Sequence, residues 1–392
     1  MPEYEKLRPL SNIKWRTVFW AVILAYFVNN VLWPKIVISG LRYTIKNVRP
    51  GECHKVKGLV NCEDVVIDRS SGIAILSCDS NRRQWNPVMG IVPKGGIQKS
   101  GELYAYDVNE PSHKPQRLST PDFVREFHPL GLSLYTLPDK TTLLYAINLA
   151  NVGFSIEIFS VHLHNATLKH ERTISHPLIT TPNSITVVND STFYVTNDHG
   201  FPSGFLHALE TYLGLPLSNV VYYSDGQASV VATGLVHANG ITLDHEKKRM
   251  YVSESLAGRV SVYRVDRSGS LEHDSSVDVG FVTDNLDLDP ATGDVTIAGH
   301  PKPLALVAFA KWGAGPSGSI VKRIKERSIN DGKVAKDDQN NWDVQTVFED
   351  DGNFHPASST GAFVKRKDGT TRMIMTSLYG EDALTDCSTD NL

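Results

Sequence analysis

Two patterns of hydrophobic and polar positions divide the chain near residue 39. Residues 17–33 (TVFWAVILAYFVNNVLW) form an apolar run that only Thr17, Asn29 and Asn30 break. Beyond this run, short segments in which apolar and polar residues alternate are separated by polar turns. The first pattern is typical of a membrane segment, and the second is typical of β-strands.

A strand–turn–strand unit recurs six times in the second part of the chain. Its copies cover residues 63–77, 131–148, 183–196, 239–254, 285–299 and 361–376. Hairpins spaced roughly 50 residues apart are typical of propeller blades. Further strand candidates at 101–106, 155–161 and 258–265 bring most blades to about four strands. We therefore predict an all-β fold, a six-bladed β-propeller. A pair of β-sandwiches is the alternative, but it does not require so regular a spacing.

One segment departs from the strand pattern. Residues 203–215 carry apolar side chains at helical spacing. We expect a short accessory helix on one face of the propeller, where it either packs against a blade or rests on a membrane.

The apolar run predicts a transmembrane signal anchor that extends weakly to residue 38. More basic residues precede the run than follow it, which favours a cytoplasmic N-terminus. They are Lys6, Arg8, Lys14 and Arg16 before it, and Lys35, Arg42 and Lys46 after it. The chain then divides into a cytoplasmic tail (1–16), an anchor (17–38) and a lumenal or extracellular propeller (39–392). No small-residue cleavage pattern follows closely, so an uncleaved anchor is favoured over a removed signal peptide, which would make the protein secreted.

Sequons and cysteines agree with that compartment. Asn165 and Asn189 each begin a glycosylation triplet. The four cysteines, an even number, permit disulfides without requiring them; they are Cys53, Cys62, Cys78 and Cys387. A bridge from Cys53 to Cys387 would tie the two ends of the domain together. The formal net charge of −4 leaves no basic excess for a nucleic-acid backbone, so we expect no nucleic acid as a partner.

Polar residues open the predicted inner strands. In a propeller the first strand of each blade lines the axis, so these residues from several blades should converge. They are Glu63, Asp64, Asn183, Asn239, Asp284 and Asn285. A single Asn or Asp before a strand is more often a turn residue that bonds its own backbone. Their recurrence in different blades instead favours calcium, which prefers hard oxygen ligands; zinc would fit poorly.

Several segments resemble the serum paraoxonase (arylesterase and lactonase) family, in the family's order. They are Asn61-Cys-Glu-Asp, Thr196-Asn-Asp-His-Gly-Phe, Glu210-Thr-Tyr-Leu-Gly-Leu, Val220-Val-Tyr-Tyr-Ser, Ala238-Asn-Gly-Ile, Asp284-Asn, Asp289-Pro-Ala-Thr-Gly-Asp and Gly299-His-Pro. The similarity runs from about Cys53 to Cys387. It implies a six-bladed propeller with two axial calcium ions, one catalytic and one structural, and a Cys53–Cys387 disulfide. Whether Cys62 and Cys78 pair stays open.

The resemblance also implies a ligand set for each ion. The catalytic-calcium ligands fall on Glu63, Asn183, Asn239, Asp284 and Asn285, all with the family's residue types. The structural-calcium ligands fall on Asp64, the backbone carbonyl of Leu132, and Ser184, where the family has an aspartate. Because calcium affinity follows ligand charge, the second ion should bind weakly or be absent.

The family's proposed catalytic histidine pair is missing. Leu130 and Leu149 occupy the two positions, and leucine can neither accept a proton nor orient a base. His300, matched to a family histidine near the site, is the first candidate for a replacement base, followed by His199 and His128. A water on the ion, activated by a ligand carboxylate, is another route.

The sequence therefore supports calcium-dependent hydrolysis of carboxylic esters or lactones. The two leucines favour hydrophobic substrates. A non-catalytic, calcium-stabilised propeller that acts as a lumenal binding module is the main alternative. A gluconolactonase-like or strictosidine-synthase-like relative is a third possibility, since these share the propeller.

Overall fold

The computed structural model describes residues 15–28, 33–93, 95, 100–327 and 341–392. Most of the expected cytoplasmic tail (1–14) and part of the expected anchor (29–32) lie outside the described residues. Before the propeller come helices α1 (Trp15–Phe27) and α2 (Trp33–Ile38). Within the described ranges, no helix is both long and apolar enough to cross a membrane.

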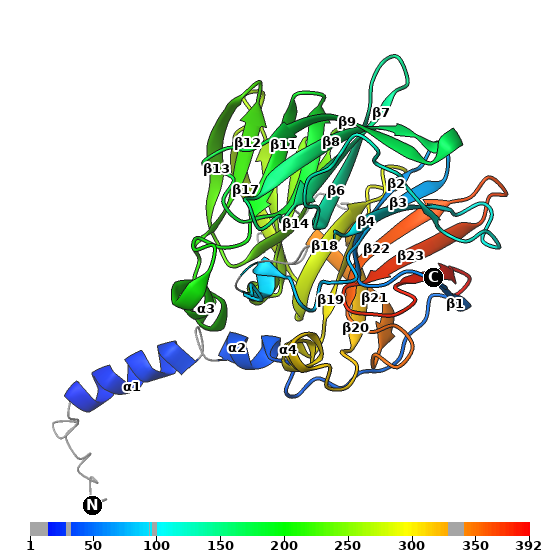
Figure 1. The fold of residues 1–392 in the computed structure, drawn as a ribbon. Helices are drawn as coiled ribbons and strands as arrows, with labels where there is room; N and C mark the ends of the chain where they lie inside the picture. The colour runs from blue at the N-terminus through cyan, green and yellow to red at the C-terminus, as the bar shows by residue number, and fades with distance from the viewer. Residues whose placement is uncertain (1–14, 29–32, 94, 96–99, 328–340) are drawn as a thin grey trace, which may run out of the picture.

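In the described ranges, 24 strands form six four-stranded antiparallel sheets, which confirms the six-bladed propeller (Figure 1). Blade I consists of β2 (Cys62–Asp68), β3 (Ile73–Cys78), β4 (Glu102–Asp107) and β5 (Gln116–Arg117). Blade II consists of β6 (Pro129–Thr136), β7 (Thr142–Asn148), β8 (Ser155–His162) and β9 (Thr167–Ile174). Blade III consists of β10 (Pro182–Asn189), β11 (Thr192–Asn197), β12 (Ser218–Ser224) and β13 (Gln227–Leu235).

The remaining blades follow the same order, with one exception at the ring closure. Blade IV consists of β14 (Ala238–Asp244), β15 (Arg249–Glu254), β16 (Arg259–Val265) and β17 (Leu271–Asp278). Blade V consists of β18 (Val282–Leu288), β19 (Val295–His300), β20 (Ser319–Glu326) and β21 (Trp342–Asp350). Blade VI consists of β22 (Ser358–Lys365), β23 (Thr371–Ser377) and β24 (Leu384–Ser388), and its fourth strand is β1 (Cys53–Val56) from the start of the domain.

The first strand of each blade faces the axis, and consecutive first strands contact one another around the ring. Apolar clusters fill the space between neighbouring blades. One of them joins Tyr145 and Ile147 of blade II to Phe193 and Val195 of blade III. Burial of these side chains on both faces of each sheet fixes the blades relative to one another and leaves the starts of the first strands, most of them polar, to meet at the axis.

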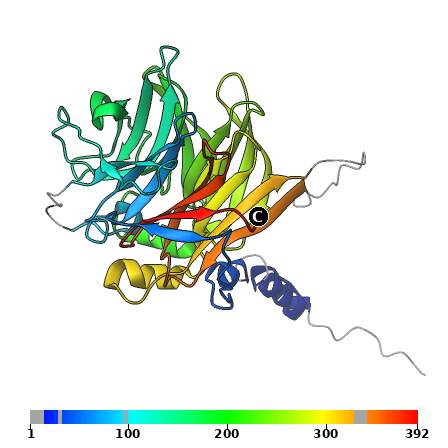
Figure 2. The ribbon, with the colours of Figure 1, turned by 90° about the vertical axis from the view of Figure 1, so that its right-hand side faces the viewer.

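Two helices cover one end of the propeller. The expected accessory helix is α3 (Gly204–Leu213), which follows β11, and α4 (Pro303–Trp312) follows β19. Figures 1 and 2 place α1, α2 and α4 on the same side of the propeller. The Lys35 ammonium of α2 donates a hydrogen bond to the carbonyl of Leu213 at the end of α3.

Both cysteine pairs form disulfides between adjacent strands. Cys53 of β1 faces Cys387 of β24 and is bonded to it, which confirms the expected closure of the ring. Cys62 and Cys78, whose pairing the sequence left open, face each other across β2 and β3 and are also bonded. The two bridges differ mainly in the length of chain that they enclose, with sequence separations of 334 and 16 residues.

This difference makes a testable prediction. In the chain-entropy account, a bridge that closes a loop of 16 residues stabilises by about 3 kcal/mol and one of 334 residues by about 6 kcal/mol. Replacing Cys53 and Cys387 by alanine should therefore cost more unfolding free energy than the matched replacement of Cys62 and Cys78. Denaturant unfolding of both double variants measures this, and an equal or greater cost for the short loop would contradict it.

Candidate functional site

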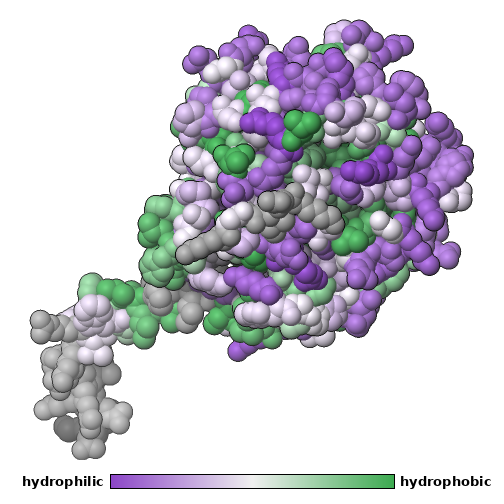
Figure 3. All heavy atoms as spheres, in the orientation of Figure 1, coloured by the Kyte–Doolittle hydropathy of each residue, from purple (hydrophilic) through white to green (hydrophobic). Residues whose placement is uncertain are grey.

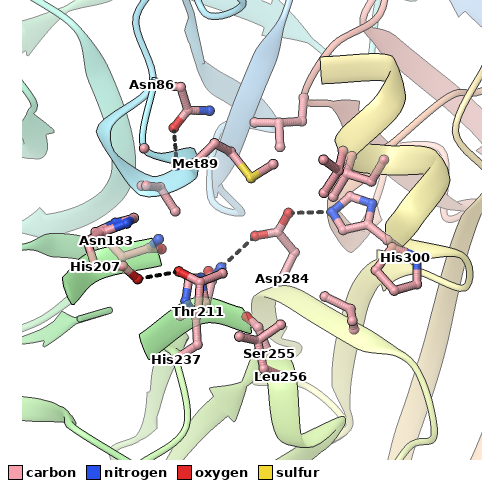
Figure 4. A pocket seen from close by; sticks show the side chains of 18 of the residues that line it. Asn86, Met89, Asn183, His207, Thr211, His237, Ser255, Leu256, Asp284 and His300 are labelled. Atoms are coloured by element: carbon pink, nitrogen blue, oxygen red, sulfur yellow. Dashed lines mark hydrogen bonds and ion pairs between the residues drawn. The ribbon is translucent and has the colours of Figure 1, made fainter. Parts of the chain in front are cut away.

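A pocket of about 260 Å³ lies at the axis beneath α3 and α4 (Figure 4). Its inner end contains the side chains of Glu63, Asn183, Asn239 and Asp284, four of the residues expected to bind calcium. Its walls come from α3, α4, the segment 86–90 and Leu130. The pocket thus combines an oxygen-rich end with largely apolar walls.

The polar residues reach the axis because strand pairing is interrupted at the start of every blade. Between the first and second strands of each blade, the register shifts by skipping residues on the first strand. The skipped positions are 63 in blade I, 130–131 in II, 183–184 in III, 239–240 in IV, 284–285 in V and 359 in VI. Such bulges release residues from the ladder and redirect their side chains.

A glycine allows two of these interruptions to lie side by side. A Cβ added at Gly240 would lie 2.6 Å from the Leu286 nitrogen and 2.7 Å from Asn285 Cα. Neither backbone atom can move without disturbing the next first strand. Gly240 therefore permits the close approach that brings Asn239 and Asn285 toward the same point.

Hydrogen bonds orient the amides at the axis. Asn285 Nδ2 donates to Glu63 Oε1 at 2.9 Å, and Asn239 Nδ2 donates to Asp284 Oδ1 at 2.9 Å. Asn183 Nδ2 donates to Asp198 Oδ2 at 3.2 Å. Because each amide nitrogen is bonded to a carboxylate, each amide oxygen points away from that carboxylate.

Those amide oxygens have no hydrogen-bond partner among the described residues. Five buried carboxylate or amide oxygens lack a hydrogen bond among the described residues, and four belong to this set: Glu63 Oε2, Asn183 Oδ1, Asn239 Oδ1 and Asn285 Oδ1. An unsatisfied buried oxygen costs about 1–3 kcal/mol. A concentration of four at one place is unfavourable unless a cation or water binds there. Neutral amides and carboxylates are the ligands that suit calcium.

The charges at the axis favour a cation as well. Burial, together with the nearby Asp64 and Asp284 carboxylates, raises the pKa of Glu63 well above its usual range. Burial also raises the pKa of Asp64 to about 6. No cluster of three or more His, Cys, Asp or Glu side chains suited to a metal occurs in the described ranges. The five residues expected to bind the first calcium ion differ from such a cluster, because three of them are asparagines. They are Glu63, Asn183, Asn239, Asp284 and Asn285.

The residues expected at the second ion fit a cation less well. Asp64 Oδ1 accepts hydrogen bonds from the Val65 nitrogen at 2.8 Å and from Thr360 Oγ1 at 2.9 Å. Asp64 Oδ2 accepts one from the Leu132 nitrogen at 2.8 Å. With Ser184 in place of a carboxylate, both oxygens of the one acidic side chain are already used by protein donors.

Only one of the three candidate catalytic histidines lines the pocket. His300 Nε2 lies 3.1 Å from Asp284 Oδ2, and His300 Nδ1 is buried with no hydrogen-bond partner in the described part of the chain. His128 lies outside the pocket lining and is paired with Asp79 at 2.7 Å and Glu126 at 3.2 Å. His199 also lies behind the wall, bonded to Asp198 at 2.7 Å and to Thr211 Oγ1 at 2.8 Å.

Two further histidines of the pocket were not identified from the sequence. The ring of His207 on α3 stacks on His199 with centroids 3.8 Å apart, and His237 meets His199 edge-on at 4.6 Å. Burial and the charge of His199 lower the pKa of His207 to about 4 and that of His237 to about 3. Although burial opposes it, the Asp198 carboxylate raises the pKa of His199. The only signal in the sequence was that His237 lies two residues before Asn239.

The two leucines at the positions of the missing histidine pair belong to the apolar core. Leu130 lines the pocket, while Leu149 is buried, and both lie in the cluster between blades II and III. Trp85 Nε1 donates to the Leu149 carbonyl at 2.7 Å. This side of the pocket therefore offers apolar contact and no proton acceptor from either position.

A family described as Arylesterase matches residues 44–368. Serum paraoxonase/lactonase 3 of Rattus norvegicus is 33% identical over 302 residues, which are 76% of this chain and 83% of the relative. Serum paraoxonase/arylesterase 2 of Gallus gallus is 33% identical over 275 residues, 70% of this chain and 75% of the relative.

Solved structures share the fold at low identity. A putative gluconolactonase has a TM-score of 0.51 at 14% identity and covers 88% of this chain and 98% of its own. The PQQ-bound aldose sugar dehydrogenase of Streptomyces coelicolor has a TM-score of 0.53 at 13% identity, with coverages of 88% and 99%. At these low identities, the similarity shows only that the propeller fold is shared.

Proposed function

The chain belongs to the arylesterase family of serum paraoxonases and lactonases, and on that premise we propose that it hydrolyses hydrophobic carboxylic esters or lactones with the help of calcium. The observation that carries the proposal is the group of four unpartnered oxygens at the inner end of an apolar-walled pocket. Family membership supports the reaction class, and the oxygens support the ion.

In this proposal, different residues of the chain bind the ion, bind the substrate and accept a proton. Glu63, Asn183, Asn239, Asp284 and Asn285 would hold calcium. When bound, the ion would polarise the ester or lactone carbonyl and offset the charge that develops on its oxygen. Leu130 and the apolar residues of α3 and α4 would bind the acyl group and exclude water. His300 lines the pocket, and its Nδ1 has no hydrogen-bond partner among the residues that the structure describes, so it is the proposed acceptor for a proton from water.

A non-catalytic, calcium-stabilised binding module is the second candidate function. The burial of Leu130 and Leu149 in one apolar cluster favours it, because the family's histidine pair is absent as a unit. Both candidate functions require calcium binding, but only the hydrolase predicts turnover of esters or lactones. They can therefore be separated by measuring calcium binding and hydrolysis on the same protein.

We predict that Asn239→Ala removes most of the effect of calcium on stability and turnover. Saturating calcium, at about 100 times its dissociation constant, should stabilise the full-length protein in detergent by about 2.7 kcal/mol. Hydrolysis of phenyl acetate and of a medium-chain lactone should stop on chelation. Asn239→Ala should lose most of the stabilisation and at least about 100-fold in turnover.

Asn148→Ala is the matched control, since Asn148 is buried but hydrogen-bonded through both ends of its amide, away from the axis. It should lower stability without changing the calcium response. Turnover that persists after chelation would contradict the calcium-dependent hydrolase. A calcium-induced rise in melting temperature with no turnover would favour the binding module.

We also propose that the wild-type protein binds one calcium ion and that Ser184→Asp admits a second. Gly131 packs against Ser184, and the next residue, Leu132, donates to Asp64, so Ser184 and Asp64 flank the same stretch of β6. A second carboxylate there should raise the calorimetric stoichiometry from one to two. Ser184→Asn, which adds size without charge, is the control. Two strong sites in the wild type would contradict the prediction.

The proposed anchor rests on the exposure of α1. Trp15, Phe19, Trp20 and Leu24 are 79%, 60%, 65% and 61% exposed, and Figure 3 shows an apolar surface along this helix. So much exposed apolar area favours a lipid environment. We propose that residues 17–38 hold the chain in a membrane, with 1–16 cytoplasmic and 39–392 lumenal or extracellular.

Glycosylation tests this topology. Asn165 is exposed, whereas Asn189 is half-buried and its Oδ1 accepts hydrogen bonds from Ser191. In microsomes, the chain should stay in the membrane pellet after alkaline extraction and carry a glycosidase-sensitive glycan that Asn165→Gln removes. Val22→Arg combined with Leu24→Arg should release it from the pellet. An unglycosylated chain recovered in the soluble fraction would contradict the proposal.

A further inference from the structure

The Cys62–Cys78 disulfide lies directly beside a residue of the axial site. In blade I, the pairs Cys62–Cys78 and Asp64–Ser77 flank the interruption between β2 and β3, and Glu63 is the residue that the register skips. Glu63 lines the pocket, whereas neither cysteine does. The two cysteines are 0% and 3% exposed. The bridge is therefore an internal link one residue away from the pocket.

Other blades hold the start of the first strand with a side chain at the same place. In blades II, III and IV, the last residue of the second strand pairs with the first residue of the first strand, just beyond the interruption. The side chain of that last residue also accepts a hydrogen bond from the backbone ahead of the first strand. These bonds run from the His128 nitrogen to Asn148 at 2.9 Å, from the Thr181 nitrogen to Asn197 at 3.0 Å and from the Val236 nitrogen to Glu254 at 3.0 Å.

Blades V and VI use the same position with different partners. His300 ends β19, and its Nε2 lies 3.1 Å from Asp284 Oδ2 of β18. Ser377 ends β23, and its hydroxyl donates to the Pro356 carbonyl ahead of β22. A polar side chain at the end of the second strand thus fixes the start of the first strand in five blades.

Blade I has a covalent bond at this position. Cys78 ends β3 and pairs with Cys62, the first residue of β2, to which it is bonded. The cysteine side chain has no oxygen or nitrogen with which to make the polar contact of the other blades. The disulfide therefore takes the place of that contact, and it does so immediately before Glu63.

Glu63 is subject to repulsion at the axis. Its side chain is buried close to the Asp64 and Asp284 carboxylates, whose charges oppose its own, and Arg82 offsets only part of this repulsion. Until a cation binds, an ionised Glu63 is driven away from the other carboxylates. A firm hold on the neighbouring backbone is therefore needed to keep its side chain in the pocket.

The polar contacts of this part of the backbone are neutral hydrogen bonds to hydroxyls. The Glu63 carbonyl accepts hydrogen bonds from Thr360 Oγ1 and from Thr376 Oγ1, both at 3.2 Å. The Asp64 nitrogen donates to Ser77 Oγ at 3.1 Å. Each bond of this kind contributes only about 1 kcal/mol. The disulfide is the one covalent restraint between β2 and β3 beside this residue.

We propose that the Cys62–Cys78 bridge positions Glu63 for calcium, by fixing the start of β2 before the ion binds. The proposal rests on the calcium binding proposed above and goes beyond it, because neither cysteine belongs to the ligand set or to the pocket lining. It gives the two disulfides different roles: the short bridge sets calcium affinity, and the long bridge stabilises the closed ring.

The test compares the removal of each bridge from the full-length protein in detergent. Cys62→Ala with Cys78→Ala removes the short bridge, and Cys53→Ala with Cys387→Ala is the matched control. The control bridge joins β1 to β24 at the edge of blade VI that lies away from its first strand. Calorimetric titration with calcium gives the dissociation constant, and the melting temperature in chelator reports folding. If the alanine pair unfolds, Cys62→Val with Cys78→Ala restores apolar volume at this core position.

We expect loss of the short bridge to weaken calcium binding by at least about 10-fold, and loss of the long bridge to weaken it by less than about 3-fold. This order is the reverse of the order expected for unfolding free energy, so a general loss of stability does not account for it. In a Glu63→Gln background, removal of the short bridge should change calcium affinity by less than about 3-fold, because the charge that it positions is gone.

Three results would overturn the positioning role while leaving calcium binding intact. They are an unchanged calcium affinity in a folded variant without the short bridge, an equal loss of affinity on removal of either bridge, and a loss that persists in full in the Glu63→Gln background. A wild-type protein that binds no calcium would remove the proposed ion and this role together. Ester or lactone turnover does not enter the comparison, so the outcome is independent of whether the protein is a hydrolase or a binding module.

Discussion

The interruption of strand pairing at the start of every blade is the constraint on which the site depends. A propeller closes only if its first strands approach one another at the axis, and there each strand must give up part of its ladder. The freed residues are buried, so their polar atoms require partners. Each asparagine at the axis has only one of its two polar atoms paired. Its amide nitrogen donates to a neighbouring carboxylate, whereas its amide oxygen has no partner among the described residues. The fold thereby holds a set of oxygens ready for a cation.

Helix α3 connects this axial arrangement to the outer surface. Its inner face carries His207 and Thr211 into the pocket, whereas Phe205 is exposed and does not line the pocket. Glu210, which is buried, accepts hydrogen bonds from the nitrogens of Gly200 and Phe201 and so fixes the turn after β11 to the helix. The segment that carries Asp198 and His199 and the helix that carries Thr211 are therefore held in register by the protein's own hydrogen bonds.

The sequence predicted the features that leave a pattern along the chain, and it did not predict those that depend on contacts in space. Six blades, the Cys53–Cys387 closure and the accessory helix are confirmed because each follows from periodicity or from the need to join the two ends of a ring. The Cys62–Cys78 bridge required strand register, which the pattern does not give. Helix α4 is apolar nearly all round, so its sequence had no helical stripe to recognise. The contact between His199 and Thr211 joins a loop to a helix, and no spacing rule predicts it.

The six interrupted positions carry different types of residue, and as a result the pocket has a polar side and an apolar side. Blades I, III, IV and V contribute Glu63, Asn183, Asn239, Asp284 and Asn285, whereas blade II contributes Leu130. At the blade VI position, Ser359 Oγ bonds within the protein, to the Cys62 carbonyl and to Thr376. One side of the axis can therefore accept a charged or polar group, and the blade II side can accept only an apolar one. In the proposed reaction, an ester would meet both requirements with its carbonyl oxygen on a cation held by the amide oxygens and its hydrocarbon against Leu130. That orientation follows from which residue each blade places at the same structural position.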